Sequence, residues 1–421
     1  MSTANGRRVA IVAGYRTPFC KSGTALKEAR AVDLARAVAR ELFERTQLDG
    51  GDVDEVIFGQ VVPSALVPNV AREVSLLPQF PKEIPAYSLN RACASAAQAV
   101  SAAHDQIALG NADVVIAGGV ESLSDIPILA SRRLADILVE ANKAKTLGAR
   151  LSAFSHIRAR DLVPVSPAIA EPSTGETMGQ SAEKMAKENH IAREAQDRWA
   201  LRSHQLSAQA TDDGRLAAEI VPWFPVQPDE PVITQDNGVR RDTSLEQMAK
   251  LKPVFDRRYG TVTAANSSPL TDGASAVLLM SEEAAQALGH TPLAYIRSYA
   301  VAAVDPGWQL LQAPIFAVPK ALERAGIQWK DLGLVEIHEA FAAQVLSNLR
   351  GFEEKGWDLN EEIINVMGGS IAIGHPFGAT GGRIVTTMIN ELSRNGGGLG
   401  LAAICSGGGQ GDALLLEVSR D

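Results

Sequence analysis

The chain has few cysteines and no long apolar run. Only three of its 421 residues are cysteines, at positions 20, 93 and 405. Three cysteines cannot form a disulfide framework, and no two have metal-ligand spacing, so we expect free thiols in a reducing compartment and no metal site. No stretch reaches the roughly 18 apolar residues of a membrane span. Residues 1–8 are polar and lead directly into the apolar run 9–13, so we expect no signal or transit peptide. These features predict a cytoplasmic protein with at most peripheral membrane contact.

Basic charge is also scarce. Lysine and arginine number 40 against 49 acidic residues, which gives a formal net charge of −9. Nucleic-acid binding generally needs a basic surface, so we expect no nucleic-acid partner. The 36 glycines are spread along the chain without a short period, which excludes collagen-like and linker sequences. A chain of this length exceeds one ordinary core, and we therefore expect two or three domains.

Short apolar runs alternate with stretches of helical periodicity along both halves of the chain. The predicted strands are residues 9–13, 55–59, 113–118, 334–337 and 400–404. The predicted helices are residues 33–42, 94–107 and 379–392. This alternation predicts an α/β fold with a largely buried sheet.

The second half of the chain repeats features of the first. In the first half, Cys93 precedes a helix of small residues, and a strand and Gly118–Gly119 follow. In the second half, His375 precedes a similar helix, and a strand that ends at Cys405 follows. An internal duplication explains this parallel, and chance similarity between two α/β segments is the alternative.

A segment of different character separates the halves, from about residue 127 to 253. Its first part, 131–161, carries seven basic residues against three acidic ones and interleaves them with apolar residues. This is a basic amphipathic pattern inside an acidic chain. It indicates either a solvated helical face of an inserted subdomain or a surface for an anionic membrane, a partner subunit or ligand phosphates.

Cys93 is the first candidate nucleophile. It lies in Asn90–Arg91–Ala92–Cys93–Ala94–Ser95, and small residues follow it at almost every position. At a helix N-terminus, free N–H groups and the helix dipole lower a thiol pKa, which would activate Cys93. An inert cysteine buried in a small-residue helix is the alternative, and it is the more common case for a cysteine taken alone.

Three further motifs strengthen the first interpretation. His375 lies in Gly374–His375–Pro376, where glycines allow close approach to a ligand and proline suits a first helical turn. Cys405 begins a Gly-rich turn after a buried strand, where backbone N–H groups can face an oxyanion. A tight hairpin is the alternative for that turn. His338 follows another predicted strand.

The four motifs together resemble the thiolase family, and they occur in the family's order. They are Cys93–Ala94–Ser95, His338–Glu339–Ala340–Phe341, Gly374–His375–Pro376 and Cys405–Ser406–Gly407. The resemblance covers nearly the whole chain. It implies two duplicated βαβαβαββ halves in a layered αβαβα arrangement with an inserted loop domain. We place the N-terminal half at 1–126 and 254–282, the loop domain at 127–253 and the C-terminal half at 283–421.

The resemblance also implies roles for individual residues. Cys93 is the nucleophile, His375 its base, and Cys405 the acid and base at the α-carbon of the substrate. His338 and His375 form one oxyanion hole, and the backbone N–H groups of Cys93 and Gly407 form the other. Two more residues would bind coenzyme A, namely Ser268 and Met178. Coenzyme A is then a substrate, and no permanently bound cofactor or metal is expected.

Two features indicate a subtype. His338 and the basic insertion are most similar to the β subunits of fatty-acid β-oxidation trifunctional complexes and their bacterial relatives. The implied activity is that of an acetyl-CoA C-acyltransferase (3-ketoacyl-CoA thiolase), which cleaves 3-oxoacyl-CoA with coenzyme A. An acetoacetyl-CoA thiolase in the condensing direction is the alternative, and an inactive acyl-CoA-binding scaffold is a different class. We expect a homodimer or tetramer, with a hydratase/3-hydroxyacyl-CoA dehydrogenase α subunit as a further partner.

Overall fold

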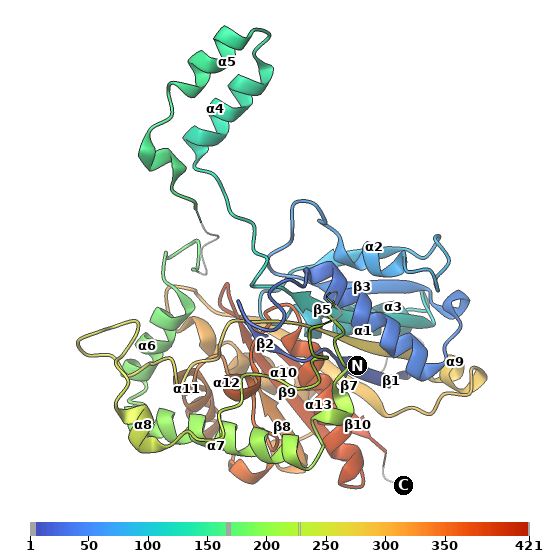
Figure 1. Ribbon diagram of the computed structural model, residues 1–421. Helices are drawn as coiled ribbons and strands as arrows, with labels where there is room; N and C mark the ends of the chain where they lie inside the picture. The colour runs from blue at the N-terminus through green and yellow to red at the C-terminus, as the bar shows by residue number, and fades with distance from the viewer. Residues whose placement is uncertain (1–5, 166–169, 226, 228, 420–421) are drawn as a thin grey trace.

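The computed structural model describes residues 6–165, 170–225, 227 and 229–419, so the first five residues of the polar N-terminus lie outside it. One mixed sheet forms its centre, in the order β4-β3-β5-β6-β1-β7-β10-β9-β8, and β2 pairs with β6 (Figure 1). The strands are β1 (Val9–Arg16), β2 (Cys20–Lys21), β3 (Glu55–Gly59), β4 (Ala86–Leu89), β5 (Val114–Glu121), β6 (Thr271–Ser281), β7 (Ala294–Ala303), β8 (Leu334–Ile337), β9 (Gly398–Ser406) and β10 (Gln410–Val418).

The two halves of the sheet repeat one strand pattern. In the first half, β5 is parallel to β3 and antiparallel to β6, which in turn is antiparallel to β1. In the second half, β9 is parallel to β8 and antiparallel to β10, which is antiparallel to β7. The halves meet where β1 pairs with β7 over two residue pairs. The prediction of duplicated α/β halves is therefore confirmed.

Helices cover both outer faces of the sheet and fill the space between its halves. In the two halves they are α1 (Ala31–Thr46), α2 (Val70–Ser75), α3 (Ser95–Ala108), α9 (Glu282–Ala287), α10 (Pro314–Ala325), α11 (Ala342–Glu353), α12 (Ser370–Ile373) and α13 (Thr380–Arg394). The central core contains residues of α3 and α13 and strand residues of both halves. Helices α10 and α11 pack on the other face of the C-terminal half. This is the predicted αβαβα layering.

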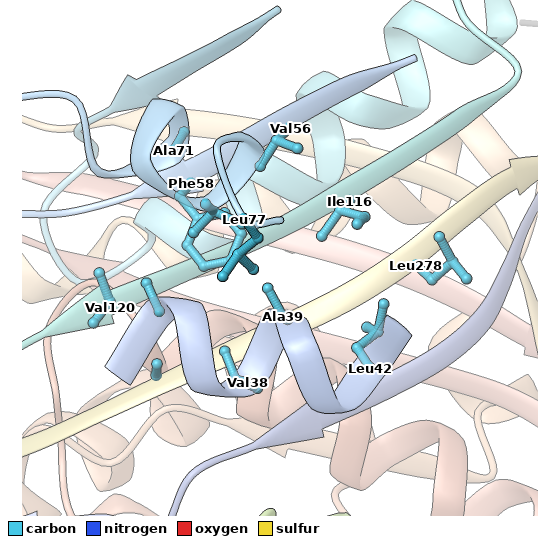
Figure 2. Packing of buried hydrophobic residues seen from close by; sticks show 14 of the residues in the cluster. Val38, Ala39, Leu42, Val56, Phe58, Ala71, Leu77, Ile116, Val120 and Leu278 are labelled. Atoms are coloured by element: carbon cyan, nitrogen blue, oxygen red, sulfur yellow. The ribbon is translucent and has the colours of Figure 1, made fainter. Parts of the chain in front are cut away.

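The alternation of side chains along the buried strands separates these layers. Ile116 of β5 points into the outer core beneath α1, whereas Val115 and Ala117 point into the central core. Figure 2 shows the outer core, where Val38 and Leu42 of α1 face strand residues. Leu42 is fully buried, and burying a leucine stabilises a fold by about 1.5–3 kcal/mol. Because helices cover both faces of these strands, successive residues of each strand are apolar and do not alternate with polar ones.

The central helices α3 and α13 approach each other closely through small residues. A Cβ added to Gly381 would lie 2.4 Å from the backbone nitrogen of Ala97. No side chain can be inserted there without moving one of the helices. This contact places the N-terminal ends of two equivalent helices, one from each half, beside each other, and Cys93 and His375 lie at those ends.

In the described residues between β5 and β6, the regular elements are helices joined by long loops. The α-helices are α4 (Arg132–Lys143), α5 (Leu147–Phe154), α6 (Met178–Glu188), α7 (Arg193–Asp212) and α8 (Leu245–Ala249). In Figure 1, α4 and α5 form a hairpin that projects away from the two halves, whereas α6–α8 lie against the C-terminal half. The predicted basic amphipathic stretch 131–161 is this hairpin. Among the helices of the described residues, none has the length and apolar character needed to cross a membrane.

Candidate active site

A cavity of about 480 Å³ lies where the two halves and the middle segment meet. Six of the seven predicted site residues line it: Cys93, Met178, Ser268, His375, Cys405 and Gly407. The seventh, His338, lies directly behind the wall, because one nitrogen of its ring, one of His375 and the sulfur of Cys93 lie within 4.8 Å of one another. Residues from distant parts of the sequence thus converge on one cavity.

A strained turn presents Cys93 to the cavity. Ala92 adopts φ +44°, a left-handed conformation that is unfavourable by about 1–2 kcal/mol for a residue with a Cβ. Two side chains hold this turn: Asn90 Oδ1 accepts the N–H of Ala92 at 2.9 Å, and the Ser95 hydroxyl donates to the Ala92 carbonyl at 2.7 Å. Cys93 is half-buried and borders the cavity, which argues against the alternative of an inert core thiol.

Burial determines the resting state of the Cys93 thiol. It raises the pKa of Cys93 to about 12, although the backbone N–H groups of Gly407 and of Cys93 itself lower it. The prediction of a lowered pKa is therefore wrong for the free protein, because desolvation outweighs the N–H groups. The two donors that the sequence assigns to an oxyanion hole do lie beside the sulfur.

His375 lies in the turn between α12 and α13. Its Nδ1 is 2.6 Å from the hydroxyl oxygen of Thr380, and its Nε2 is buried without a hydrogen-bond partner among the described residues. Burial lowers the pKa of His375 to about 3, and the charge of Arg383 adds to this shift. The sequence suggests that Pro376 lies in a first helical turn, but Pro376 precedes α13 in the structure. The helix begins at Thr380, whose N–H donates to the Pro376 carbonyl at 3.1 Å.

His338 follows β8 and is fully buried. Its ring lies against that of His375, with the centroids 4.1 Å apart and the planes 49° apart. Its Nδ1 is 3.0 Å from the Ser370 hydroxyl oxygen, and its Nε2 has no hydrogen-bond partner among the described residues. Burial, then the neighbouring His375 and Arg383, lower the pKa of His338 well below its usual value. Two neutral imidazoles thus lie against each other, with their planes tilted, close to the Cys93 sulfur.

Cys405 is the next-to-last residue of β9, and Gly407 lies in the turn that joins β9 to β10. These strands are antiparallel, with Ser406 opposite Gln410, so the Gly-rich turn is indeed a tight hairpin, and its residues also line the cavity. Burial raises the pKa of Cys405 well above its usual value, and the nearby Cys93 raises it further. The second thiol is therefore also protonated at rest.

Ser268 and Met178 also line the cavity. The backbone N–H of Ser268 donates to the Ala340 carbonyl at 2.9 Å, which fixes it beside the His338 motif. Met178 is the first residue of α6, capped by the Thr177 hydroxyl, which accepts the N–H of Gln180. A Cβ added to Gly407 would lie 4.0 Å from the Met178 sulfur, so Met178 borders the hairpin turn.

Two buried carboxylates shape the site, and the sequence motifs give neither of them a role. Glu339 accepts hydrogen bonds from Trp199 Nε1 at 3.0 Å, from the Ser203 hydroxyl at 2.7 Å and from Asn365 Nδ2 at 2.9 Å. It thereby ties the turn after β8 to α7.

Glu121 is the second carboxylate. It accepts N–H groups of Val61, Val62 and Gly378 at 3.0–3.1 Å, and burial raises its pKa to about 7. Because Gly378 belongs to the C-terminal half and the other three residues to the N-terminal half, Glu121 joins the halves at the cavity wall.

Cys93, His338 and His375 also form a set whose ligand atoms lie close enough for one metal ion. A thiolate and two imidazoles suit zinc. The same atoms are the predicted nucleophile and its neighbours, so an ion here would occupy the reacting groups. The expectation that the protein needs no metal stays a prediction.

A cavity that brings two thiols and two imidazoles together, with backbone N–H groups beside one sulfur, has the groups needed for nucleophilic acyl transfer. Family models agree with this class. The model of the thiolase N-terminal domain matches residues 9–283, and that of the thiolase C-terminal domain matches residues 290–418. The chain belongs to the thiolase family.

Individual relatives extend this match over the whole chain. The chain is 49% identical over 428 aligned positions to the 3-ketoacyl-CoA thiolases of Yersinia pestis and Yersinia pseudotuberculosis, covering 99% of this chain and 98% of each relative. Among solved structures, the acetyl-CoA acetyltransferase of Bacillus anthracis is 36% identical with a TM-score of 0.88. Human mitochondrial 3-ketoacyl-CoA thiolase is 35% identical with a TM-score of 0.86. Each alignment covers 98% of this chain and 99% of the other.

Proposed function

We propose that the protein is a 3-ketoacyl-CoA thiolase, an acetyl-CoA C-acyltransferase of fatty-acid β-oxidation. It cleaves 3-oxoacyl-CoA with coenzyme A to acetyl-CoA and an acyl-CoA shortened by two carbons. The observation that carries this proposal is the convergence of Cys93, His375 and Cys405 on one cavity. The full-length similarity to proteins named 3-ketoacyl-CoA thiolase supports it.

In the first half-reaction, His375 Nε2 takes the proton of the Cys93 thiol as the sulfur attacks the C3 ketone of the substrate. The resulting tetrahedral adduct breaks its C2–C3 bond and leaves the acyl group on Cys93 and the enolate of acetyl-CoA. Cys405 donates its thiol proton to C2 of that enolate. A thiol suits this role because it can act both as an acid and as a base near neutral pH.

Oxyanion stabilisation supplies much of the rate. The N–H groups of Cys93 and Gly407 would hold the oxygen of the acyl-enzyme adduct, and losing one such donor typically costs about 3 kcal/mol of transition-state stabilisation. His338 and His375 would stabilise the thioester oxygen of the enolate, His338 through a bound water. The closeness of both N–H groups to the Cys93 sulfur supports the first assignment.

In the second half-reaction, coenzyme A attacks the acyl-Cys93 thioester. Before this attack, the proton held by His375 passes to the Cys405 thiolate, which restores both groups. His375 then takes the proton of the coenzyme A thiol and gives it to the Cys93 sulfur as that sulfur leaves, so Cys93 returns to the thiol form. Ser268 would contact the pantetheine arm, and Met178 would line its tunnel. Their positions along the cavity wall support this, and neither a metal nor a redox cofactor takes part in any of these steps.

The test is to incubate the protein with a series of 3-oxoacyl-CoA substrates of increasing chain length. We expect thiolysis in the presence of coenzyme A and, in its absence, an acyl adduct on Cys93 detected by mass spectrometry. Cys93→Ala should abolish both. Activity confined to acetoacetyl-CoA would favour the alternative, which the likeness to the acetyltransferase of Bacillus anthracis supports. If neither an adduct nor thiolysis is observed, the proposal is refuted and an inactive acyl-CoA-binding scaffold remains.

We also propose that the protein is a cytoplasmic homodimer or tetramer that joins a hydratase/3-hydroxyacyl-CoA dehydrogenase α subunit. Strand β4 ends the sheet, and an open edge of this kind can pair with a second copy. The hairpin of α4 and α5 is rich in basic residues and projects from the two halves (Figure 1), which supports the α-subunit contact. The cytoplasmic location and the domain limits 127–253 and 282/283 stay predictions.

A further inference from the structure

We infer that Ser370 and Thr380 hold the two adjacent imidazoles of His338 and His375 in opposite tautomers. His375 then presents a bare Nε2 to Cys93, whereas His338 presents an Nε2–H. The chemical meaning of this pair of tautomers rests on the proposed function, but the tautomers themselves can be observed without turnover. Neither hydroxyl carries a role in the sequence motifs.

The Thr380 hydroxyl determines the tautomer of His375. It lies 3.0 Å from the Pro376 carbonyl oxygen, one helical turn earlier, and 2.6 Å from His375 Nδ1. A carbonyl only accepts and a hydroxyl has one proton, so a Thr380 proton directed at Pro376 leaves the oxygen free to accept. It then accepts Nδ1–H of His375. A neutral imidazole has one N–H, so Nε2 carries a lone pair.

The Ser370 hydroxyl determines the tautomer of His338 in the opposite sense. Arg383 Nη2 donates to the Ser370 oxygen at 3.2 Å, while Arg383 Nη1 is held by Glu336 Oε2 at 3.2 Å. A guanidinium has no acceptor, so the Ser370 proton cannot point at Arg383. In the part of the chain that the structure describes, the remaining partner of that hydroxyl is His338 Nδ1, at 3.0 Å. His338 Nδ1 therefore accepts, and its proton lies on Nε2.

The arrangement around the two rings favours this neutral, complementary pair. Both rings are buried, their centroids are 4.1 Å apart, and the Arg383 charge opposes protonation of either. Both Nε2 atoms lack a hydrogen-bond partner among the described residues, so each is available to substrate or water. One imidazole can thus remove a proton from Cys93, while the other can donate a hydrogen bond to an oxyanion or to the water that binds it.

Nuclear magnetic resonance of ¹⁵N-histidine-labelled full-length protein tests the tautomers directly. The chain has seven histidines, and His338→Asn and His375→Asn assign the two signals by their loss. We expect the Nδ1–H form for His375 and the Nε2–H form for His338. The same tautomer for both rings, or an Nδ1–H form for His338, overturns the inference. Absence of thiolase activity would refute the proposed function and leave this measurement intact.

Kinetics of matched variants tests the consequence. Thr380→Val removes the acceptor for Nδ1–H and should slow alkylation of Cys93 by iodoacetamide about 10-fold or more, and Thr380→Ser should restore the rate. Ser370→Ala should lower kcat for thiolysis on the order of 100-fold, because an oxyanion donor is lost, with a smaller effect on alkylation. Ser370→Thr should restore kcat. Equal losses in both assays from either variant would indicate a general packing role and contradict the inference.

Discussion

Burial controls the protonation of the groups that exchange protons in the cavity. It raises the pKa of both Cys93 and Cys405 and lowers that of His375. Near neutral pH the resting site therefore holds two thiols and a neutral imidazole rather than a preformed thiolate–imidazolium pair. The proton of Cys93 moves to His375 only as the sulfur attacks, when the oxyanion donors begin to compensate the charge.

This resting state predicts the pH dependence of Cys93 reactivity. Alkylation by iodoacetamide should keep rising from about pH 6 to about pH 10 without a plateau, because the thiolate fraction grows throughout this range. Peptide mapping with mass spectrometry gives the rate at Cys93 alone. Cys20 and Cys405 are buried and should react far more slowly. A plateau near neutral pH would reveal a preformed ion pair and contradict this picture.

Cys405 should be separable from Cys93 by assay. Cys405→Ala should lower thiolysis and α-proton exchange of acetyl-CoA in D₂O by at least about 100-fold, because no group then protonates C2. Transfer of an acyl group between Cys93 and labelled coenzyme A should persist. Cys20→Ala is a matched control, since Cys20 is buried in the outer core away from the cavity, and should retain both reactions. Loss of acyl transfer in Cys405→Ala would argue against the division of roles.

Asp412 provides a test of stability against pH. It is buried in β10, neither of its carboxylate oxygens has a partner among the described residues, and burial raises its pKa from 3.8 to about 7. A raised folded pKa means that the stability contributed by the protonated form is lost as pH rises through that window. Asp412→Asn should therefore be more stable than the wild type, and its advantage should grow by about 2 kcal/mol between about pH 5 and about pH 8.

Urea unfolding at a fixed protein concentration measures this advantage at both pH values. If the stability gained by Asp412→Asn is the same at both pH values, the titration of Asp412 does not explain it.

At the residue scale, the sequence indicates which residues form the site but not their pKa values or their distant contacts. Cys93, His375 and Cys405 are predictable because their short motifs occur in the order found in the thiolase family, although Cys93 taken alone resembles an inert buried thiol. The direction of the Cys93 pKa is not predictable, because desolvation depends on the whole cavity wall. The partner of His338, Ser370, lies 32 residues away, and only the fold brings the two together.

At the element scale, helices α3 and α13 position the site. Gly381 of α13 contacts the Ala97 backbone so closely that a methyl group would lie 2.4 Å from its nitrogen. Gly381→Ala should therefore destabilise the protein by about 1–3 kcal/mol through overpacking, and should lower activity by shifting Cys93 against His375. Thermal unfolding and thiolysis measure the two effects.

Gly148 in α5 is the matched control, because a Cβ there meets nothing within 4 Å. Gly148→Ala should be neutral or slightly stabilising and should leave activity unchanged. Equal behaviour of the two variants would show that the helices tolerate separation.

The sequence predicts the main elements within a few residues. Residues 55–59 and 334–337 coincide with β3 and β8, because short apolar runs buried on both faces have clear limits. The predicted helix 379–392 nearly coincides with α13, Thr380–Arg394, whereas Pro376 lies before the helix and not in its first turn. Short elements such as β4 and α12 carry too few residues for a periodic signal, and tertiary contacts determine them.

At the scale of the whole molecule, duplication explains why the site forms between the halves. Each half places a reactive residue before its central helix, and the two helices pack against each other in the middle layer. The alternation of elements predicts these layers. The alternation does not predict where the middle segment lies. Its helices α6–α8 pack against the C-terminal half, and the pattern of strands does not indicate that position.

The hairpin of α4 and α5 is the part of the molecule least tied to the site. Its hydrogen bonds are internal: Arg133 donates to the His156 carbonyl, Arg150 to the Ala141 carbonyl, and the Ser131 hydroxyl to the Asp161 carbonyl. Leu129 and Val165 pair through their backbones at its base. Apolar side chains of both helices, such as Leu138 and Leu151, remain exposed, so the hairpin folds on itself and offers its surface outward.

Replacing residues 131–161 by a short Gly/Ser linker should therefore leave unfolding and thiolysis of free substrates unchanged, but abolish co-purification with the α subunit that we propose as a partner. Lys143→Glu with Lys145→Glu should weaken that association as well. Lys320→Glu with Lys330→Glu makes the same charge change on exposed residues of the C-terminal half and should leave it intact. Pull-down of the tagged protein from its host, followed by identification of the bound subunit, measures the association. A hairpin variant that loses thiolysis, or that still binds the α subunit as tightly as the wild type, would show that this surface is not the docking site.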